Sequence, residues 1–489
     1  MYIQNNRLWV IAFFLLLVAF FAVEITTLGV FERDYDEGVY FAQSYLVSEG
    51  YPLYEPVDSA LPPFFIWWLA GIFTAIGAPS ILAGRMAVVI SGAFGLFSIA
   101  WIAKQLVDDK QQFVAAVGAA FLLATFPRWL LYGQVAMADI PSLSFSLFAI
   151  ALALNGWRKE RSWFFWGGVA AGIAMGLKFL AAYTAPLLAL VVLLSYRPTR
   201  PFTLPRFVID GLVTLTGFLL PLLLALPFLN LEGAYETVVY FHWSSARDWI
   251  DQPAALRLMA VFHWEHIGWV VLAVVGLGYL AYRRMWRVLL LLIGWELLVV
   301  VMLSQHAPLW GHLLLPLASP VILAGSITLA EGVLAASRRA WAAMAPILIS
   351  FLLFLALWPR ALTADQASTV PIPDDEAALL QDEVIPWLRA TVAENEFLLT
   401  DSPMIAVRTG RLVLPDKTDT SFTKIFSGFL TAEDLITAAE EQQPAAIIFW
   451  TDRFRSQKKW REWVKEHYVI GYEKSSTRRI FLRPDLANQ

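Results

Sequence analysis

Three carboxylates stand close together early in the chain: Asp34, Asp36 and Glu37. They directly follow an apolar stretch long enough to cross a membrane, so they are expected where the membrane meets water. A carboxylate at that depth can take a proton from an attacking hydroxyl or bind a cation. It can equally cap the start of a helix, because the helix dipole favours acid in the first turn. The residues alone leave both interpretations open.

Asp139 is a second carboxylate of this kind, placed directly before Ile140-Pro141 at the start of another apolar stretch. An acid just before a proline is also a good N-terminal cap for a helix. Two separated carboxylates at the mouths of membrane helices would suit acid–base chemistry or a cation site that faces one shared cavity.

Three basic residues stand near the ends of apolar stretches: Arg85, Arg128 and Lys178. Their long side chains could simply reach out of the lipid to the interface. They could also bind a phosphate group held at the level of the lipid headgroups.

Five of the six histidines fall in or beside two later loops, and they are His242, His263, His266, His306 and His312. The spacing of His263 and His266, with Glu265 between them, is compatible with a transition-metal site or with interfacial hydrogen bonding. The chain has no cysteine, which excludes disulfides, thiol catalysis and cysteine-bound metal clusters. It also has no glycine-rich phosphate loop and no G-x-S-x-G motif, so a nucleotide site or a serine hydrolase is not indicated.

The composition defines the elements that must position these residues. Of 489 residues, 58% are hydrophobic and only 16% are charged, whereas soluble domains carry about 25% charged residues. This composition predicts a multi-pass membrane protein, and the net charge of −4 gives no reason to expect a nucleic-acid partner. Apolar segments long enough to form membrane helices lie near 7–29, 79–105, 111–127, 139–155, 163–179, 181–196, 207–230, 266–281, 286–303, 313–333 and 341–358. The first segment follows Arg7 and lacks a cleavage pattern, so we expect an uncleaved anchor.

The charges of the loops predict the orientation of the chain in the membrane. One alternating set is rich in Lys and Arg, and it lies near 104–110, 158–161, 197–206, 283–287 and 338–339. The other set is acidic or nearly neutral, and it comprises 31–62, 128–138, 231–265 and 304–312. The positive-inside rule places the first set and the N-terminus in the cytoplasm. The alternation requires that 62–77, which opens with Pro62-Pro63, does not cross but forms a re-entrant or interfacial helix.

The first outer loop, 31–78, is therefore expected to carry two helices: the re-entrant one and an amphipathic one that starts at the acidic cluster and lies on the membrane. Charged residues become frequent after Trp358, which indicates a domain boundary near 360. Helix-like stretches in 361–489 alternate with strand-like runs at Phe397–Thr400, Leu412–Leu414, Ala446–Trp450, Tyr468–Tyr472 and Ile480–Leu482. We predict an all-α membrane domain of about 11–13 helices over 1–360, followed by a small extracytoplasmic α/β domain.

Several motifs follow one another through residues 1–335. They are Asp36-Glu37-Gly38-x-Tyr40, Pro62-Pro63 followed by Trp67-Trp68, Leu82-Ala83-Gly84-Arg85, Tyr132-Gly133 leading to Asp139-Ile140-Pro141, a Gly-rich helix over 172–177 ending in Lys178, and His312 followed by Pro316 and Pro320. In this order they resemble the membrane-embedded C-type glycosyltransferases. The most similar branch contains lipid A aminoarabinose transferases and protein O-mannosyltransferases.

The resemblance implies a polyprenyl-phosphate sugar donor, a lipid, glycan or protein acceptor, and inverting transfer on the outer face of the cell (inner or plasma) membrane. It implies Asp36 as the catalytic base and Asp139 as the second acidic residue of the site. The residues expected to bind substrate are Asp34, Glu37, Tyr40, Arg85, Arg128, Lys178, His242, Arg247 and His312. No cofactor is assigned, and a divalent cation at Asp36 and Asp139 stays open.

Two positions depart from the pattern of the family. Many members have a lysine before the two prolines, where it contacts the lipid phosphate, and this chain has Leu61. The late basic position, often arginine, is His312. Lys178, Arg85 or Arg247 could compensate. The alternatives are a transporter or flippase of a lipid-linked sugar and a non-catalytic sugar-binding protein. The ionisable residues cluster on the outer side, which favours a one-sided site over alternating access.

Overall fold

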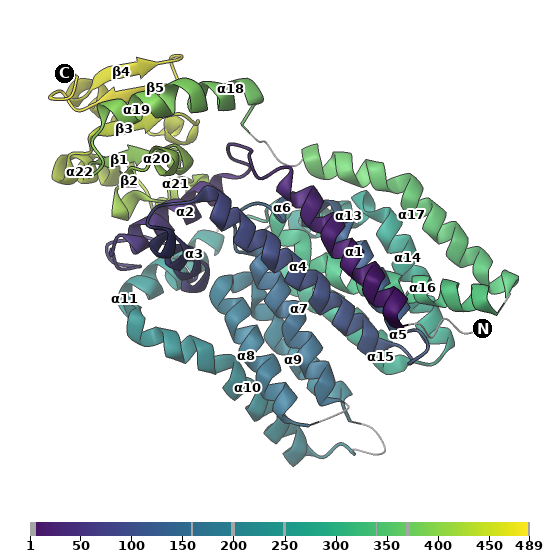
Figure 1. The fold of residues 1–489 in the computed structure, drawn as a ribbon. Helices are drawn as coiled ribbons and strands as arrows, with labels where there is room; N and C mark the ends of the chain where they lie inside the picture. The colour runs from purple at the N-terminus through teal and green to yellow at the C-terminus, as the bar shows by residue number, and fades with distance from the viewer. Residues whose placement is uncertain are drawn as a thin grey trace.

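The computed structural model shows a bundle of long helices with a smaller domain at one end (Figure 1). It describes residues 6–157, 160–196, 201–247, 251–338, 340–367 and 372–487. Five bases of the Lys- and Arg-rich loops lie outside these residues, as does the side chain of Arg247; the five are Arg158, Lys159, Arg197, Arg200 and Arg339.

Each of the eleven predicted membrane segments coincides with a helix. These helices are α1 (Asn6–Ile25), α4 (Ile81–Leu106), α5 (Gln112–Ala124), α7 (Asp139–Gly156), α8 (Ser162–Leu177), α9 (Thr184–Leu194), α10 (Leu204–Ala225), α14 (Ile267–Tyr282), α15 (Trp286–Leu303), α16 (Ala318–Ser337) and α17 (Trp341–Ala367). Among the described residues, seven helices are long and apolar enough to cross a membrane alone. An eighth span results if α13 (Gln252–Glu265) and α14, which meet at 87°, count as one. The predicted multi-pass helical architecture is confirmed.

Glycines allow α8 and α10 to pack with their backbones in direct contact. Gly168 and Gly172 lie one helical turn apart on α8, and a Cβ atom at Gly172 would stand 2.2 Å from the carbonyl oxygen of Phe218 on α10. Gly217 on α10 meets the backbone of Phe165 in the same way. Small residues at this spacing are how membrane helices approach closely without a large apolar core. On its other side, α8 packs against α7, the helix that begins at Asp139.

The first outer loop forms two short helices, α2 (Tyr35–Ser48) and α3 (Pro63–Ile76). A proline opens α3 and Gly77, in the left-handed conformation, ends it, so α3 is a separate short apolar helix as predicted. The expected position of α2 on the membrane surface is wrong. It packs between α3 and α20 (Pro403–Thr409) of the C-terminal domain, where Gly38 lies against the backbone of Met404.

The C-terminal domain contains a five-stranded sheet in the order β2-β1-β3-β5-β4, and its strands match the predicted runs. They are β1 (Phe397–Thr400), β2 (Leu412–Val413), β3 (Ala446–Phe449), β4 (Val469–Glu473) and β5 (Arg479–Leu482). The first three are parallel, and β5 is antiparallel to β3 and β4. The helices of this domain are α18 (Asp374–Leu379), α19 (Ile385–Thr391), α20, α21 (Phe422–Phe426), α22 (Ala432–Gln442) and α23 (Lys458–His467). The predicted α/β character is confirmed.

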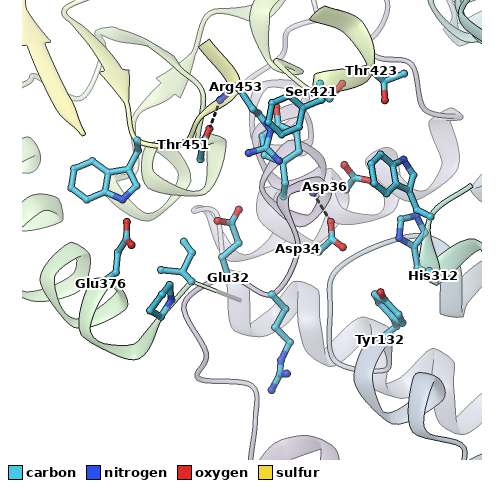
Figure 2. A pocket seen from close by; sticks show the side chains of 18 of the residues that line it. Glu32, Asp34, Asp36, Tyr132, His312, Glu376, Ser421, Thr423, Thr451 and Arg453 are labelled. Atoms are coloured by element: carbon cyan, nitrogen blue, oxygen red, sulfur yellow. Dashed lines mark hydrogen bonds between the residues drawn. The ribbon is translucent and has the colours of Figure 1, made fainter. Parts of the chain in front are cut away.

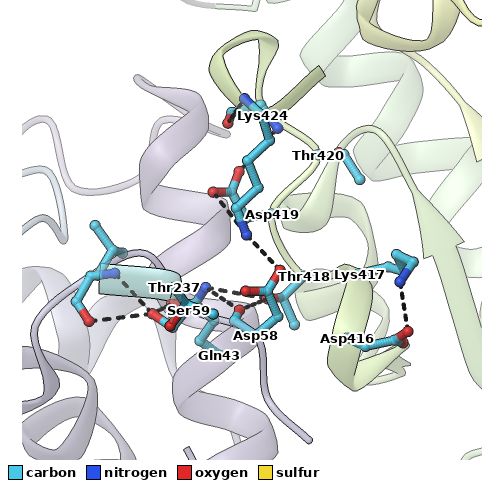
Figure 3. A network of polar contacts seen from close by, with 12 residues as sticks. Gln43, Asp58, Ser59, Thr237, Asp416, Lys417, Thr418, Asp419, Thr420 and Lys424 are labelled. Carbon is cyan, nitrogen blue, oxygen red and sulfur yellow. Dashed lines mark hydrogen bonds and ion pairs between the residues drawn. The ribbon is translucent and has the colours of Figure 1, made fainter. Parts of the chain in front are cut away.

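The segment 415–424 of the C-terminal domain, which we call the docking loop, contacts the first outer loop through hydrogen bonds and an ion pair (Figure 3). Lys424 pairs with the carboxylate of Asp58 at 2.5 Å, and the hydroxyl of Thr418 donates to the Asp58 carbonyl oxygen at 2.8 Å. The amide of Gln43 on α2 donates to the Thr418 hydroxyl at 3.2 Å. The domain is therefore fixed against α2.

We expect Gly172→Val to destabilise the helix bundle, because the added side chain has no space between the α8 and α10 backbones. Forced overpacking of this kind typically lowers the free energy of unfolding by about 1–3 kcal/mol, and by more where backbone atoms obstruct the side chain. Thermal unfolding in detergent measures the change. Gly211→Val on α10 is the matched control, since a Cβ atom there meets nothing within 4 Å. Equal melting temperatures for the two variants would show that the close approach is unimportant.

Candidate active site

A cavity of about 520 Å³ lies where the first outer loop meets the C-terminal domain (Figure 2). One wall carries Asp34 and Asp36, and a second carries Tyr132 and His312. The third wall belongs to the C-terminal domain and includes Ser421, Thr451 and Arg453. Segments far apart in the sequence thus build one chamber at the end of the helix bundle.

The two aspartates of the acidic cluster have different positions in this cavity. Asp34 caps α2, since its Oδ1 accepts a hydrogen bond from the backbone N–H of Asp36 at 3.0 Å. The Asp36 side chain is half-buried and borders the open space. Burial, together with the negative charges of Asp34 and Asp419, raises the pKa of the Asp36 carboxyl, while Lys178 opposes the shift. An acid with a raised pKa that borders a cavity can exchange a proton near neutral pH.

Glu37 and Arg85 form a two-pronged ion pair that is almost completely shielded from solvent. Arg85 Nε donates to Glu37 Oε1 at 2.8 Å, and Nη2 donates to Oε2 at 2.6 Å. The remaining guanidinium nitrogen donates to the carbonyl oxygens of Leu28 and Val30, and the N–H of Ala136 donates to Glu37. The pair ties α2 and α4 to the segment that follows α1 and to the segment before Asp139. Neither side chain lines the cavity.

Asp139, at the start of α7, forms an ion pair with Lys178, at the end of α8. Asp139 opens α7, and Lys178 follows the last residue of α8. The ammonium group lies 2.7 and 2.6 Å from the two carboxylate oxygens. His312 borders the same small hollow as this pair. Both carboxylate oxygens of Asp139 accept hydrogen bonds from Lys178, and this arrangement does not favour a metal ion bound jointly by Asp36 and Asp139.

Several basic side chains gather near Lys178. The pKa of His306 is lowered to about 4 by burial and by the neighbouring His242, Lys178 and His312. Those three groups therefore lie within electrostatic reach of His306, and His312 also borders the hollow that holds Lys178. His242 also contacts the carbonyl oxygen of Val238 on its own helical stretch at 2.7 Å. The structure therefore brings the expected Lys178, His242 and His312 together.

Arg128 is buried and has no contact with the cavity. Its guanidinium lies 2.6 Å from the carboxylate of Asp365 and 3.3 Å from that of Glu265. It also donates to the carbonyl oxygen of Gly311 at 2.7 Å, which fixes the residue before His312. His266 Nε2 lies 2.9 Å from the other oxygen of the Asp365 carboxylate. Arg128 is thus the cation that pairs with both acidic residues near His266, Glu265 and Asp365.

The two histidines proposed as a metal motif separate in the structure. His263 contacts Glu296 at 2.9 Å, whereas His266 faces Asp365. Tyr40 is buried within α2 with its ring edge-on to Phe65, at 5.1 Å between ring centres, and it does not line the cavity.

From the sequence we expect the C-terminal domain to cover the site or help to choose the acceptor, but neither His306 nor any residue of that domain is among the expected site residues. His306 lies in the same outer loop as His312, and that shared loop was a usable signal. Thr451 and Arg453 directly follow a predicted strand, at the edge where parallel strands usually bind ligands. Nothing in the sequence, however, indicates that this edge faces Asp36.

The bundle, the helical first outer loop and the C-terminal α/β domain define the fold of the membrane-embedded C-type glycosyltransferases. ArnT from Cupriavidus metallidurans in the apo state has a similar structure, with a TM-score of 0.64, 14% identity and 98% coverage of both chains. The same protein bound to undecaprenyl phosphate gives a TM-score of 0.61 at 14% identity, covering 97% of this chain and 98% of that one. The Archaeoglobus fulgidus oligosaccharyltransferase AglB, in complex with an inhibitory peptide and a dolichol-phosphate, gives a TM-score of 0.54 at 12% identity. The match covers 96% of this chain and 74% of that one.

The sequence itself gives a more particular match. Residues 61–227 match the family model described as dolichyl-phosphate-mannose-protein mannosyltransferase. A comparison with curated proteins finds no match. The family match and the shared fold confirm the predicted resemblance to C-type glycosyltransferases.

We expect Glu37→Gln to destabilise the protein, because it leaves the Arg85 charge buried without its partner. Breaking one side of a buried ion pair costs about 3–5 kcal/mol. Thermal unfolding in detergent provides the measurement, and Glu49→Gln is the control, since Glu49 stands exposed just after α2. A Glu37→Gln variant that melts with the wild type would contradict a structural role for the pair.

Proposed function

We propose that the protein transfers a sugar from a polyprenyl-phosphate donor to a hydroxyl group of an acceptor at the outer membrane surface. The observation that carries this proposal is Asp36 at the edge of a cavity that His312 also lines, with Lys178 and Asp139 in a small hollow that His312 borders as well. The undecaprenyl phosphate and dolichol-phosphate bound to proteins of the same fold support a donor linked to a lipid phosphate.

The chemistry requires an acid–base group on one side of the sugar and positive charge on the other. The acceptor oxygen attacks the anomeric carbon from the face opposite the phosphate, while the bond from that carbon to the phosphate oxygen breaks. Ionised Asp36 takes the proton from the acceptor hydroxyl. Lys178 stabilises the charge that grows on the leaving phosphate, and His306 and His312 can donate hydrogen bonds to it as neutral imidazoles, because burial lowers the pKa of both. Attack from the opposite face inverts the configuration.

Asp139 orients Lys178 through its two contacts and supplies the counter-charge of that ammonium group. We therefore route no step through a divalent cation between Asp36 and Asp139. We assign Glu37 and Arg85 to holding α2 in place, and Arg128 to holding the residue before His312, because their polar atoms are engaged in those contacts.

We propose that the cavity faces the extracytoplasmic side and that the N-terminus lies in the cytoplasm. The distribution of basic loops supports this orientation. The C-terminal domain then covers the site from outside. Its docking loop would hold it there, since Lys424 and Thr418 contact the first outer loop directly.

Replacing Asp36 by asparagine keeps the size of the side chain and removes the base. We expect turnover to fall by about 10²–10⁴-fold while the melting temperature changes little. The assay measures transfer of radiolabelled sugar from a polyprenyl-phosphate donor to a membrane extract, with Glu49→Gln as the control. Undiminished transfer by Asp36→Asn would reject this residue as the base. Movement of the donor across proteoliposomes without any transfer would reject a transferase altogether.

The raised pKa of Asp36 predicts that activity depends on pH. Only the ionised carboxylate can take a proton, so kcat/KM should rise with pH through an apparent pKa above the usual value of about 3.9 for aspartate. Asp34 is the charged group that raises this pKa most. We expect Asp34→Asn to move the rise to lower pH, as measured by kcat/KM between pH 4 and about 9. An unmoved profile, or one moved to higher pH, would contradict this arrangement.

A further inference from the structure

Arg453 is a cation on the wall of the cavity that belongs to the C-terminal domain. Its guanidinium lies over the ring of Tyr35, 3.5 Å from the ring centre, and 5.1 Å from the ring centre of Phe422. Its Nε atom is buried and has no hydrogen-bond partner among the described residues. Arg478, another arginine of this wall, pairs instead with Glu376 at 2.7 Å. Arg453 thus presents a charge held by aromatic rings, with no ion pair to a described carboxylate.

Glu32 lines the same cavity and does not neutralise this charge. Its carboxyl Oε1 also lacks a hydrogen-bond partner among the described residues. Burial and the nearby charge of Glu37 raise the pKa of Glu32 to about 8, so it carries a proton at neutral pH. The Arg453 side of the cavity therefore stays positive, and Asp34 and Asp36 line the same cavity.

The local structure holds Arg453 in place. It follows β3, beside the carboxyl end of β1, where the connections of the sheet leave in opposite directions. The Asp401 carboxylate accepts from the N–H groups of Trp450 at 2.7 Å and Thr451 at 3.0 Å, which fixes the turn before Arg453. Carboxyl ends of parallel strands at such a reversal commonly bind ligands.

We propose that Arg453 binds a phosphate or carboxylate group of the sugar acceptor, so that the C-terminal domain selects an anionic acceptor. This inference rests on the proposed transferase function. The planar guanidinium suits both anions because it can donate two parallel hydrogen bonds. Tyr35, whose ring supports Arg453, directly precedes Asp36 in the chain. An acceptor anchored at Arg453 would thereby bring a hydroxyl into the chamber that Asp36 borders (Figure 2).

Calorimetric titration of the full-length protein in maltoside detergent tests this subsite. The probes are two pairs that differ in one anion: dihexanoyl phosphatidic acid against dihexanoylglycerol, and octyl glucuronide against octyl glucoside. We expect one anionic probe to bind about tenfold or more tightly than its uncharged partner. The pair that shows the preference identifies phosphate or carboxylate as the group recognised. Equal binding within both pairs would overturn the proposal.

Variants assign the preference to Arg453. Arg453→Gln should reduce the affinity for the anionic probe about tenfold, and Arg453→Lys should restore part of it by keeping the charge. Arg455→Gln is the matched control, because Arg455 is exposed two residues further on. A preference that survives in a folded Arg453→Gln variant would overturn the proposal.

The outcome is separable from that of the transferase proposal. Asp36→Asn should keep the anion preference even as transfer is lost. Loss of transfer without any anion preference rejects only the Arg453 subsite. An Arg453-dependent preference with full transfer by Asp36→Asn rejects only the assigned base.

Discussion

The buried ion pair between Glu37 and Arg85 is the constraint on which the site depends. A charge removed from water must keep its partner, so α2, α4 and the segment before Asp139 have to stay in one arrangement. Glu37 points into this cluster, and its neighbour Asp36 therefore faces another direction, toward the cavity. One acidic cluster thus divides into a cap, a cavity carboxylate and an anchor, three roles that the same side-chain chemistry can fill.

The sequence was sufficient to predict the main architecture because its physical signals are local. A membrane helix needs a long apolar run, and each of the eleven predicted runs coincides with a helix. The strands of the C-terminal domain are short apolar runs between polar turns, and they too lie where predicted. Lys178 beside Asp139 and His312 near both were expected as members of one site, and the structure brings them together.

The unpredicted features depend on contacts between distant segments. The apolar face of α2 suits a membrane surface as well as it suits another helix. Only the fold shows that α20 packs against α2, with Met404 beside Gly38. Arg85 and Arg128 are residues of the type that binds phosphate. Each is instead paired with a carboxylate, Glu37 or Asp365, from a distant part of the chain, which the sequence does not indicate. The approach of Arg453 to Tyr35 joins residues far apart in the sequence, and no local pattern encodes it.

The docking loop has a consequence for the biosynthesis of the protein. Residues 415–453 complete the third wall of the cavity, and ribosomes make them after every helix of the bundle. A nascent chain with all of its spans inserted would still display an open, unfinished chamber. The chamber gains its third wall only once the C-terminal domain has folded and docked on α2.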